Sequence, residues 1–327
     1  MNFLNVSGVY RQEGNNLVVK NISFTQHQFQ KIAIAGETGS GKSTLLKMIA
    51  GLVQPTSGTV YFEEKRVLGP EEILLPGHPA IAYLSQHFEL RNNYRVHELL
   101  QMANKITDEE ANIIYSVCRI SHLLNRKTDQ LSGGEKQRIA MAGLLTAAPK
   151  LLLLDEPFSN LDTPHKNMMK AVVRDIGDIL NITCLLVSHD PVDILSWADE
   201  IMVMKDGQVI QKGTPEQVYK QPVNEYTAAL FGTYNIISVA LFNELAELFD
   251  IQINGRDICV RPENFSIVSN SNGALQGRVN KVLFCGSFYE LEVQINTDIL
   301  IVKTHLRDIK EGDPIYLYLS PEDVGYI

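Results

Sequence analysis

Lys31-Ile-Ala-Ile-Ala35 runs directly into Gly36-Glu-Thr-Gly-Ser-Gly-Lys42-Ser43-Thr44, and this stretch decides the fold. The apolar half predicts a buried strand, and residues 43–50 carry apolar side chains at helical spacing. Between them the glycines let the backbone curl, so that successive N–H groups point toward a bound phosphate. The helix that follows adds its positive end to the same place. A strand, a glycine-rich turn and a helix in this order predict a nucleotide-binding α/β core.

Two side chains at the end of the turn carry the chemistry. Lys42 is expected to reach the β- and γ-phosphates, and the Ser43 hydroxyl is expected to ligate Mg²⁺. Thr44 either contacts the α-phosphate or packs in the core, and the sequence leaves both open. The rest of the predicted phosphate site is the loop itself, that is Gly36, Glu37, Thr38, Gly39, Ser40 and Gly41.

An apolar run that closes on two acids follows further along the chain, Leu151-Leu-Leu-Leu-Asp155-Glu156-Pro157. Parallel α/β sheets place their ligands at the carboxyl ends of the strands, so Asp155 and Glu156 are expected beside the phosphate loop. The alternative is a pair of acids that end a strand and face solvent. The phosphate loop upstream favours the first interpretation.

In Leu131-Ser-Gly-Gly-Glu-Lys-Gln-Arg138, the residues Ser132, Gly133 and Gly134 precede a predicted helix that runs from Glu135 to Ala147. Ser132 is a natural N-cap, and every helix start needs a cap whatever its function. Capping alone requires neither Gly133 and Gly134 nor the Glu-Lys-Gln-Arg tail. The stretch therefore carries more than a helix cap requires.

Together and in this order, these motifs resemble the ATP-binding cassette family, whose signature sequence is similar to LSGGQ. The resemblance implies two bound cofactors, ATP and Mg²⁺, and hydrolysis between two copies of the domain. It implies that Glu156 is the general base, that Asp155 orients Mg²⁺ through water, and that Lys42 holds the γ-phosphate. It also implies that Ser132, Gly133 and Gly134 meet the γ-phosphate held by the other copy.

Four single residues complete the site by the same resemblance. Gln86 in Tyr83-Leu-Ser-Gln86 resembles the loop that senses Mg²⁺ and joins the core to a helical subdomain. His189 in Leu186-Val-Ser-His189-Asp190 resembles the switch histidine at the γ-phosphate, and Asp162 in Ser159-Asn-Leu-Asp162 resembles the loop that faces the other copy. Tyr10 is the best candidate for the aromatic residue that stacks on adenine, with Phe3 or a role in the core as alternatives.

Two further stretches are similar to importer ATPases within the family. Residues 201–219 continue the importer resemblance, and Arg261-Pro262-Glu263 with residues 277–286 resembles the C-terminal oligomer-binding-like (TOBE) domain of maltose, polyamine, sulfate and iron importers. The resemblance implies a homodimer, peripheral on the cytoplasmic face of the cell membrane. Its implied partners are a membrane permease and, indirectly, an extracytoplasmic substrate-binding protein. Gly143, where importers usually have arginine, and the unusual loop 87–95 predict an atypical permease contact.

The predicted fold class is therefore α/β, a P-loop cassette with an antiparallel β-subdomain and a helical subdomain, followed by a small all-β OB-like domain. Residues 1–232 form the predicted cassette, with the helical subdomain at about 87–147. Residues 233–327 form the predicted β-domain, because short strand-like runs alternate there with Gly, Asn, Asp and Pro.

Composition excludes several other classes. No stretch approaches the roughly 18 apolar residues of a membrane span, and the N-terminus does not resemble a secretory signal. Four cysteines without metal spacing predict free, buried thiols in a reducing compartment and no zinc site.

Two alternative functions are less consistent with the sequence. One alternative is a soluble cassette ATPase that remodels nucleic acid. The chain carries a net charge of −9, and residues 234–327 hold seven Lys and Arg against thirteen Asp and Glu, which is the wrong sign for phosphate-backbone binding. The other alternative is a non-catalytic regulatory subunit, and intact Lys42, Glu156 and His189 argue against it. The transported solute does not contact such a subunit, so the sequence does not identify it.

Overall fold

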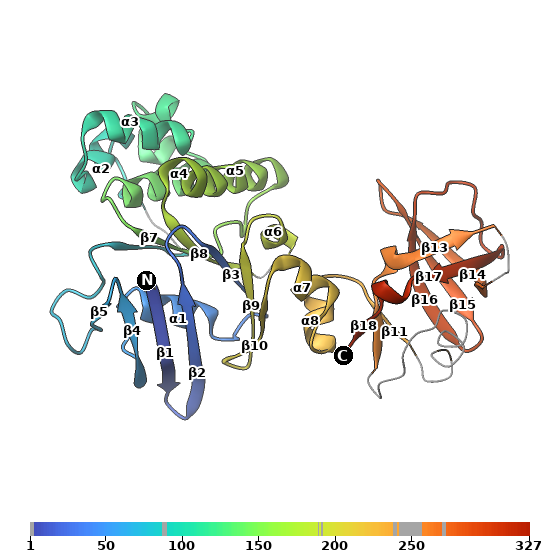
Figure 1. The fold of residues 1–327 in the computed structure, drawn as a ribbon. Coiled ribbons are helices and arrows are strands. Elements are labelled where there is room, and N and C mark those ends of the chain that lie inside the picture. Colours follow the sequence, from blue (N-terminus) through green and yellow to red (C-terminus); the bar gives the residue numbers. More distant parts are fainter. Residues whose placement is uncertain are drawn as a thin grey trace. The chain divides into compact units, whose positions relative to one another are not determined.

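The computed structural model describes residues 3–86, 90–188, 190, 192–237, 241, 257–269 and 273–327. They form two compact units, Met1–Pro215 and Glu216–Ile327 (Figure 1). This division falls before the boundary expected at Gly232, which stays a prediction. The α/β cassette and the C-terminal β-domain predicted from the sequence are both present.

The first unit contains two sheets. The antiparallel sheet has the order β2-β1-β4-β5, and the larger sheet has the order β10-β9-β3-β8-β7-β6, in which only β10 is antiparallel. Their strands are β1 (Leu4–Glu13), β2 (Asn16–Gln26), β3 (Lys31–Ala35), β4 (Ser57–Phe62), β5 (Lys65–Arg66), β6 (Ile81–Leu84), β7 (Leu151–Asp155), β8 (Thr183–Ser188), β9 (Glu200–Lys205) and β10 (Gln208–Gly213).

The parallel and antiparallel strands differ in burial, as their sequences predict. Every residue of β7 and β8 is buried, which is typical of central parallel strands covered on both faces. Strand β2 includes exposed positions between buried ones, because one face of an antiparallel sheet meets water. The central strands thus bring their polar carboxyl ends to one edge of a buried sheet.

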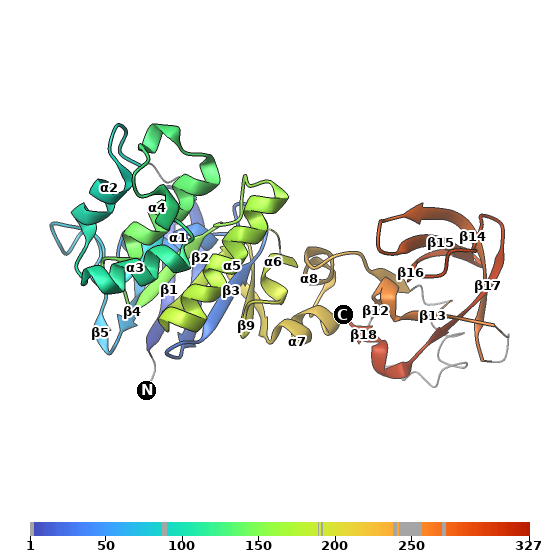
Figure 2. The ribbon, with the colours of Figure 1, turned by 90° about the horizontal axis from the view of Figure 1, so that it is seen from above.

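The helices of the first unit pack against this sheet and against one another. Helix α1 sends Leu45, Leu46 and Ile49 into a core that it shares with both sheets. Helices α2, α3 and α4 gather at the top of Figure 1, and Figure 2 shows α4 beside α5. The bounds are α1 (Lys42–Ile49), α2 (Val96–Ala103), α3 (Asp108–Val117), α4 (Gly133–Leu145), α5 (Thr163–Leu180) and α6 (Val192–Leu195), with 3₁₀ turns η1 (Ser121–Leu123) and η2 (Thr128–Gln130). Among the described residues, no helix is long and apolar enough to cross a membrane.

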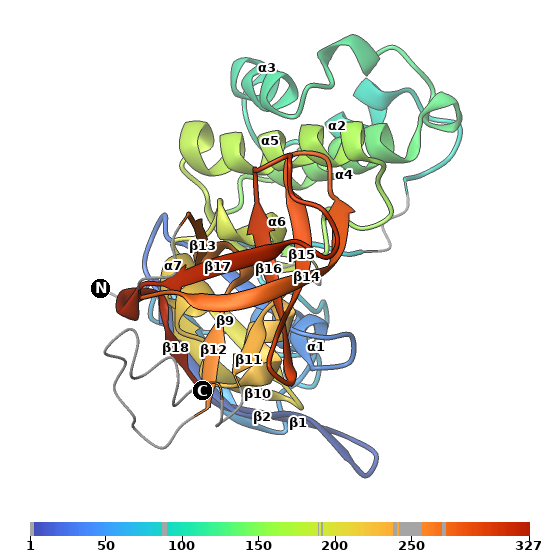
Figure 3. The ribbon, with the colours of Figure 1, turned by 90° about the vertical axis from the view of Figure 1, so that its right-hand side faces the viewer.

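The second unit has two antiparallel sheets, with the orders β11-β12-β18 and β13-β17-β14-β15-β16, around one apolar core. Figure 3 looks onto β14 to β17. The elements are α7 (Pro215–Lys220), α8 (Glu225–Leu230), β11 (Asn235–Ile237), β12 (Ile258–Val260), η3 (Pro262–Asn264), β13 (Phe265–Val268), β14 (Leu275–Phe284), β15 (Tyr289–Ile295), β16 (Asp298–Thr304), β17 (Pro314–Leu319), η4 (Pro321–Asp323) and β18 (Gly325–Tyr326).

Arg261 links the two short helices of this unit to its strands. Its side chain is buried, and it donates hydrogen bonds to the backbone carbonyls of Tyr219 (3.3 Å), Ala228 (2.9 Å), Gly232 (3.1 Å) and Thr233 (3.1 Å). The guanidinium also lies 4.3 Å from the Tyr219 ring centre. Tyr219 and Ala228 lie in the last turns of α7 and α8, and Gly232 and Thr233 follow α8, so one cation from the β-domain binds the carbonyl ends of both helices.

The four cysteines are free thiols, as predicted, but the expectation that all of them are buried is wrong for Cys285. Cys118, Cys184 and Cys259 are buried, and Cys285 is exposed. Burial raises the pKa of Cys118 and of Cys184 to about 12, so both thiols stay protonated. Among the described residues, no group of three or more His, Cys, Asp and Glu side chains is arranged so that it could hold a metal ion.

Candidate active site

The turn between β3 and α1 has the backbone that its glycines predict. Gly36, Gly39 and Gly41 all have positive φ, of 153°, 86° and 94°. A Cβ on Gly36 would lie 2.3 Å from the Met204 carbonyl oxygen, and a Cβ on Gly41 would lie 2.5 Å from that of Val18. Any side chain at these two glycines would collide with backbone, so the curled loop depends on them.

Lys42 is the first residue of α1, and its side chain is only 4% exposed. Its Nζ donates to the carbonyl oxygens of Gly36 (2.7 Å) and Glu37 (2.6 Å). Burial lowers the pKa of the Lys42 ammonium, while the charges of Glu156, Asp155 and Glu37 act in the opposite direction. A buried ammonium beside a curled glycine-rich loop is suited to binding a polyanion.

Asp155 ends β7 directly beside this loop, as predicted. Ser43 Oγ donates to its Oδ1 at 2.8 Å, and the Tyr83 hydroxyl donates to its Oδ2 at 2.7 Å. Burial and the contact with Asp155 raise the pKa of Tyr83, so the phenol remains a donor. Tyr83 was not predicted as a site residue, although it stands in the Tyr83-Leu-Ser-Gln86 stretch. A tyrosine in a buried strand three residues before Gln86 was the available signal.

Glu156 lies next to Asp155 and is turned by an unusual backbone. Its φ is 51°, and its N–H donates to the carbonyl of Val187 on β8 at 3.0 Å. Gln86 Nε2 donates to Glu156 Oε2 at 3.2 Å. The two predicted residues are thus in contact, and the amide orients the carboxylate.

The signature stretch forms the start of α4. Ser132 Oγ accepts from the Glu135 N–H at 3.3 Å, and Glu135 Oε2 accepts from the Ser132 N–H at 2.8 Å, which is a capping box. A Cβ on Gly133 would have no atom within 4 Å, whereas one on Gly134 would lie 2.9 Å from the His165 ring. Gly133 is therefore open to solvent, and Gly134 lets α4 approach α5.

Gln137, in the tail of the signature, contacts the segment that follows β7. Its buried Nε2 donates to the carbonyl of Pro157 at 2.8 Å, next to Glu156. The sequence singled out the Glu-Lys-Gln-Arg tail without giving it a role. This contact provides one, since it joins the helix that starts at Ser132 to the backbone that holds the carboxylate.

Two predicted residues make their contacts elsewhere. Asp162 is the N-cap of α5, accepts from the His165 N–H at 3.0 Å, and has its pKa lowered by that hydrogen bond. Tyr10 lies on β1 opposite Ser57 of β4 and is half-buried. His189 lies outside the described residues. Within the described residues of one chain, the hydrogen bonds of Ser132 stay at its own helix start.

Comparison with known proteins identifies the family. A family model described as ABC transporter matches residues 19–159, and one described as TOBE domain matches residues 258–326. The spermidine/putrescine import ATP-binding protein PotA of Clostridium acetobutylicum is 33% identical, over 98% of this chain and 95% of that protein. The chain belongs to the ABC transporter family, among its ATP-binding subunits.

Other ABC proteins agree with this assignment. The Fe(3+) ions import ATP-binding protein FbpC of Photorhabdus laumondii is 29% identical, over 98% of this chain and 95% of that protein. The solved structure of CbiO1 from Clostridium perfringens, part of an ABC transporter complex, is 27% identical with a TM-score of 0.58, over 66% of this chain and 90% of that chain. A dimeric ATP-binding cassette bound to ADP and Pi is 25% identical with a TM-score of 0.55, over 65% of this chain and 98% of that chain. As an ABC ATPase, the chain binds nucleotide and hydrolyses ATP.

Proposed function

We propose that this chain powers a binding-protein-dependent importer, as a homodimeric ATPase on the cytoplasmic face of the cell membrane. The observation that carries the proposal is the contact of Lys42, Ser43, Asp155, Glu156 and Gln86 around one phosphate loop. Similarity to import ATP-binding proteins along 98% of the chain supports the direction of transport.

The catalytic steps follow from these positions. Glu156 accepts a proton from the attacking water, and Gln86 holds its carboxylate in place at 3.2 Å. Lys42 and the loop amides stabilise the negative charge of the phosphates as the terminal phosphoryl group leaves. Ser43, Asp155 and Gln86 offer the oxygen ligands that Mg²⁺ prefers, and the ion, when bound, neutralises phosphate charge.

The second half of each site comes from the other copy of the chain. The start of α4 offers the Gly133 and Gly134 N–H groups and the Ser132 hydroxyl, which suit a terminal phosphate held by the partner. Asp162 and His189 remain proposed contacts of the closed dimer, Tyr10 remains the proposed adenine contact, and Thr44 remains open between the α-phosphate and the core. ATP would close the dimer, and hydrolysis with product release would reopen it.

The proposed permease contact lies in the helical subdomain. A hollow of about 420 Å³ beside α2 and α4 is lined mainly by apolar side chains, among them Leu90, Leu99 and Leu144, and by Gly143. Thr128 Oγ1 donates to the Arg91 carbonyl at 2.9 Å, and this hydrogen bond holds the middle of the unusual loop 87–95. Residues 87–89 lie outside the described residues. Because Gly143 adds no side chain, an apolar segment of the permease fits the hollow.

Reconstitution with membrane partners tests this function. The chain, the permease and the binding protein encoded with it are assembled in lipid vesicles loaded with ATP and Mg²⁺. We expect uptake of the solute that the binding protein carries, and hydrolysis that the loaded binding protein stimulates. Export of that solute, or hydrolysis that responds to DNA or RNA instead, would contradict the proposal.

A further inference from the structure

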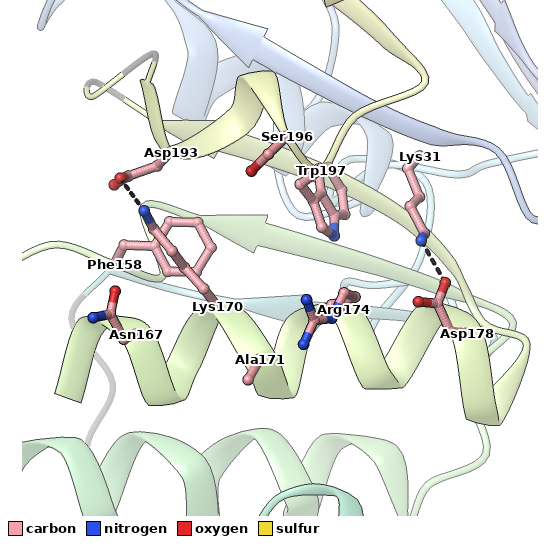
Figure 4. A pocket seen from close by; sticks show the side chains of 10 residues that line it. All are labelled: Lys31, Phe158, Asn167, Lys170, Ala171, Arg174, Asp178, Asp193, Ser196 and Trp197. Atoms are coloured by element: carbon pink, nitrogen blue, oxygen red, sulfur yellow. Dashed lines mark hydrogen bonds and ion pairs between the residues drawn. The ribbon is translucent and has the colours of Figure 1, made fainter. Parts of the chain in front are cut away.

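A pocket of about 410 Å³ lies between α5 and the segment that contains α6, in the first unit (Figure 4). It includes none of the residues assigned above to phosphate, Mg²⁺ or water. Its volume is within the range of small-molecule sites. The lining residues are Lys31, Phe158, Asn167, Lys170, Ala171, Arg174, Asp178, Asp193, Ser196 and Trp197.

Two of its three cations are neutralised by carboxylates of the same wall. Lys31 Nζ lies 2.6 Å from Asp178 Oδ1, and Lys170 Nζ lies 2.6 Å from Asp193 Oδ1. Gly177 permits the first pair, because a Cβ there would lie 2.8 Å from Lys31 Cε. The two pairs leave the wall with one further positive charge, that of Arg174.

Arg174 has only a distant carboxylate among the described residues. Its Nε lies 3.9 Å from Asp175 Oδ1, while the other oxygen of Asp175 accepts from Arg119 at 2.8 Å. The Arg174 side chain is 64% exposed and free to turn. A guanidinium with five donors and no close carboxylate is suited to bidentate contact with an oxyanion.

Trp197 supplies a second donor to the same space. Its indole N–H is buried and has no acceptor among the described residues. Figure 4 shows this nitrogen facing α5, on the side where Arg174 lies. A buried donor without an acceptor is unfavourable, so an oxygen that reached it after a turn of Arg174 would be bound favourably.

The pocket also borders the catalytic segments. Phe158 follows Glu156 by two residues and forms one apolar wall. Lys170 shares the buried carboxylate of Asp193 with Lys166, whose Nζ lies 2.6 Å from Asp193 and 2.8 Å from Asp190. This chain of ion pairs holds α5 against the segment that follows β8.

We propose that this pocket binds a small organic oxyanion, a carboxylate or a phosphate monoester with an apolar body, and that its occupant slows ATP hydrolysis. The oxyanion group contacts Arg174 and the Trp197 N–H, and the apolar body packs on Phe158 and Ala171. Lys170 lies one helical turn from Arg174, so the occupant draws it from Asp193 and removes one of the two ion pairs that join Asp193 to α5.

Fluorescence tests binding directly, because Trp197 is the only tryptophan of the chain. Phenyl phosphate and benzoate are titrated separately into the full chain at constant ionic strength. We expect a saturable change with at least one probe, and the tighter probe identifies the charged group. Arg174→Gln should weaken binding at least tenfold, whereas Arg66→Gln, at an exposed arginine outside the pocket, should not. Binding that survives Arg174→Gln and disappears in Lys42→Ala belongs to the phosphate loop and overturns the proposal, as does no saturable change.

Rates of ATP hydrolysis with and without the probe test whether the occupant of the pocket slows the enzyme. Saturating probe should lower kcat several-fold with little change in the KM for ATP, since the pocket does not overlap the phosphate loop. Arg174→Gln should hydrolyse ATP normally and lose this inhibition. Inhibition that is competitive with ATP, that persists in Arg174→Gln, or that is absent although the probe binds would overturn it.

Discussion

Lys42 illustrates how a single residue depends on its loop. Its ammonium is buried and donates to two backbone carbonyls of the loop. This position places the ammonium where it can donate to phosphate oxygens. We expect Lys42→Ala to abolish ATP binding or hydrolysis without altering the fold, because the change removes the main cation of the phosphate site. Nucleotide titration, hydrolysis rates and circular dichroism measure these effects. Hydrolysis near the unmodified rate would refute the phosphate-loop assignment.

Tyr83 is the residue that the structure adds to the site. Its hydroxyl donates to the carboxylate proposed to orient Mg²⁺, and a hydrogen bond to a charged group contributes about 1.5–3 kcal/mol. We expect Tyr83→Phe to raise the Mg²⁺ concentration for half-maximal hydrolysis about tenfold, with a smaller effect on the KM for ATP. Tyr61→Phe, on an exposed tyrosine of β4, is the control. Equal Mg²⁺ dependence in both variants would show that the hydrogen bond is only structural.

Among the elements, the loop before α2 and the hollow beside α4 are proposed to serve coupling. We expect replacement of residues 87–94 by a Gly/Ser linker to spare basal hydrolysis and to abolish stimulation by the permease. Arg95 is kept because its N–H donates to Glu98 at the start of α2. Gly143→Arg, which fills the hollow, should have the same effect. Hydrolysis rates with and without permease measure it, and a collapse of basal hydrolysis would place the loop in the active site.

The C-terminal ends of α7 and α8 in the second unit depend on Arg261, which donates to carbonyls at and after these ends. We expect Arg261→Met to destabilise the second unit by about 1–3 kcal/mol, because buried acceptors lose their donor. Hydrolysis by the chain alone should not change. Thermal unfolding should show a shift of one of two transitions, and Arg278→Met, at an exposed arginine that bonds the Gly312 carbonyl, should cause a smaller shift. A shift of both transitions would show that the two units unfold as one.

Elements with a strong local signal were predictable from the sequence. Strand 31–35 has the predicted bounds, because buried parallel strands are continuous apolar runs. Helix α8, which has only six residues, and strand β16, which forms a hairpin with the preceding β15, were not predicted. Gln137 and Tyr83 were missed for a different reason. Their roles come from contacts with Pro157 and Asp155, which are distant in sequence.

At the scale of the whole molecule, the central claim is a site shared between two copies. One chain brings Lys42, Ser43, Asp155, Glu156 and Gln86 together, while Ser132 caps the helix that it starts. If the start of α4 acts in the partner's site, binding of ATP must favour the dimer. Loss of hydrolysis must then trap it.

Size-exclusion chromatography of Glu156→Gln with ATP and Mg²⁺ tests this most directly. The amide keeps the size of the side chain but cannot accept the proton, so hydrolysis should fall by about 10²–10⁴-fold. Loss of a negative charge near the phosphates should also favour closure, and the protein should elute as an ATP-bound dimer. Adding Ser132→Arg should return it to a monomer, because the larger side chain fills the partner's phosphate site. A Glu156→Gln protein that remains monomeric and hydrolyses ATP at the unmodified rate would contradict both the general base and the shared site.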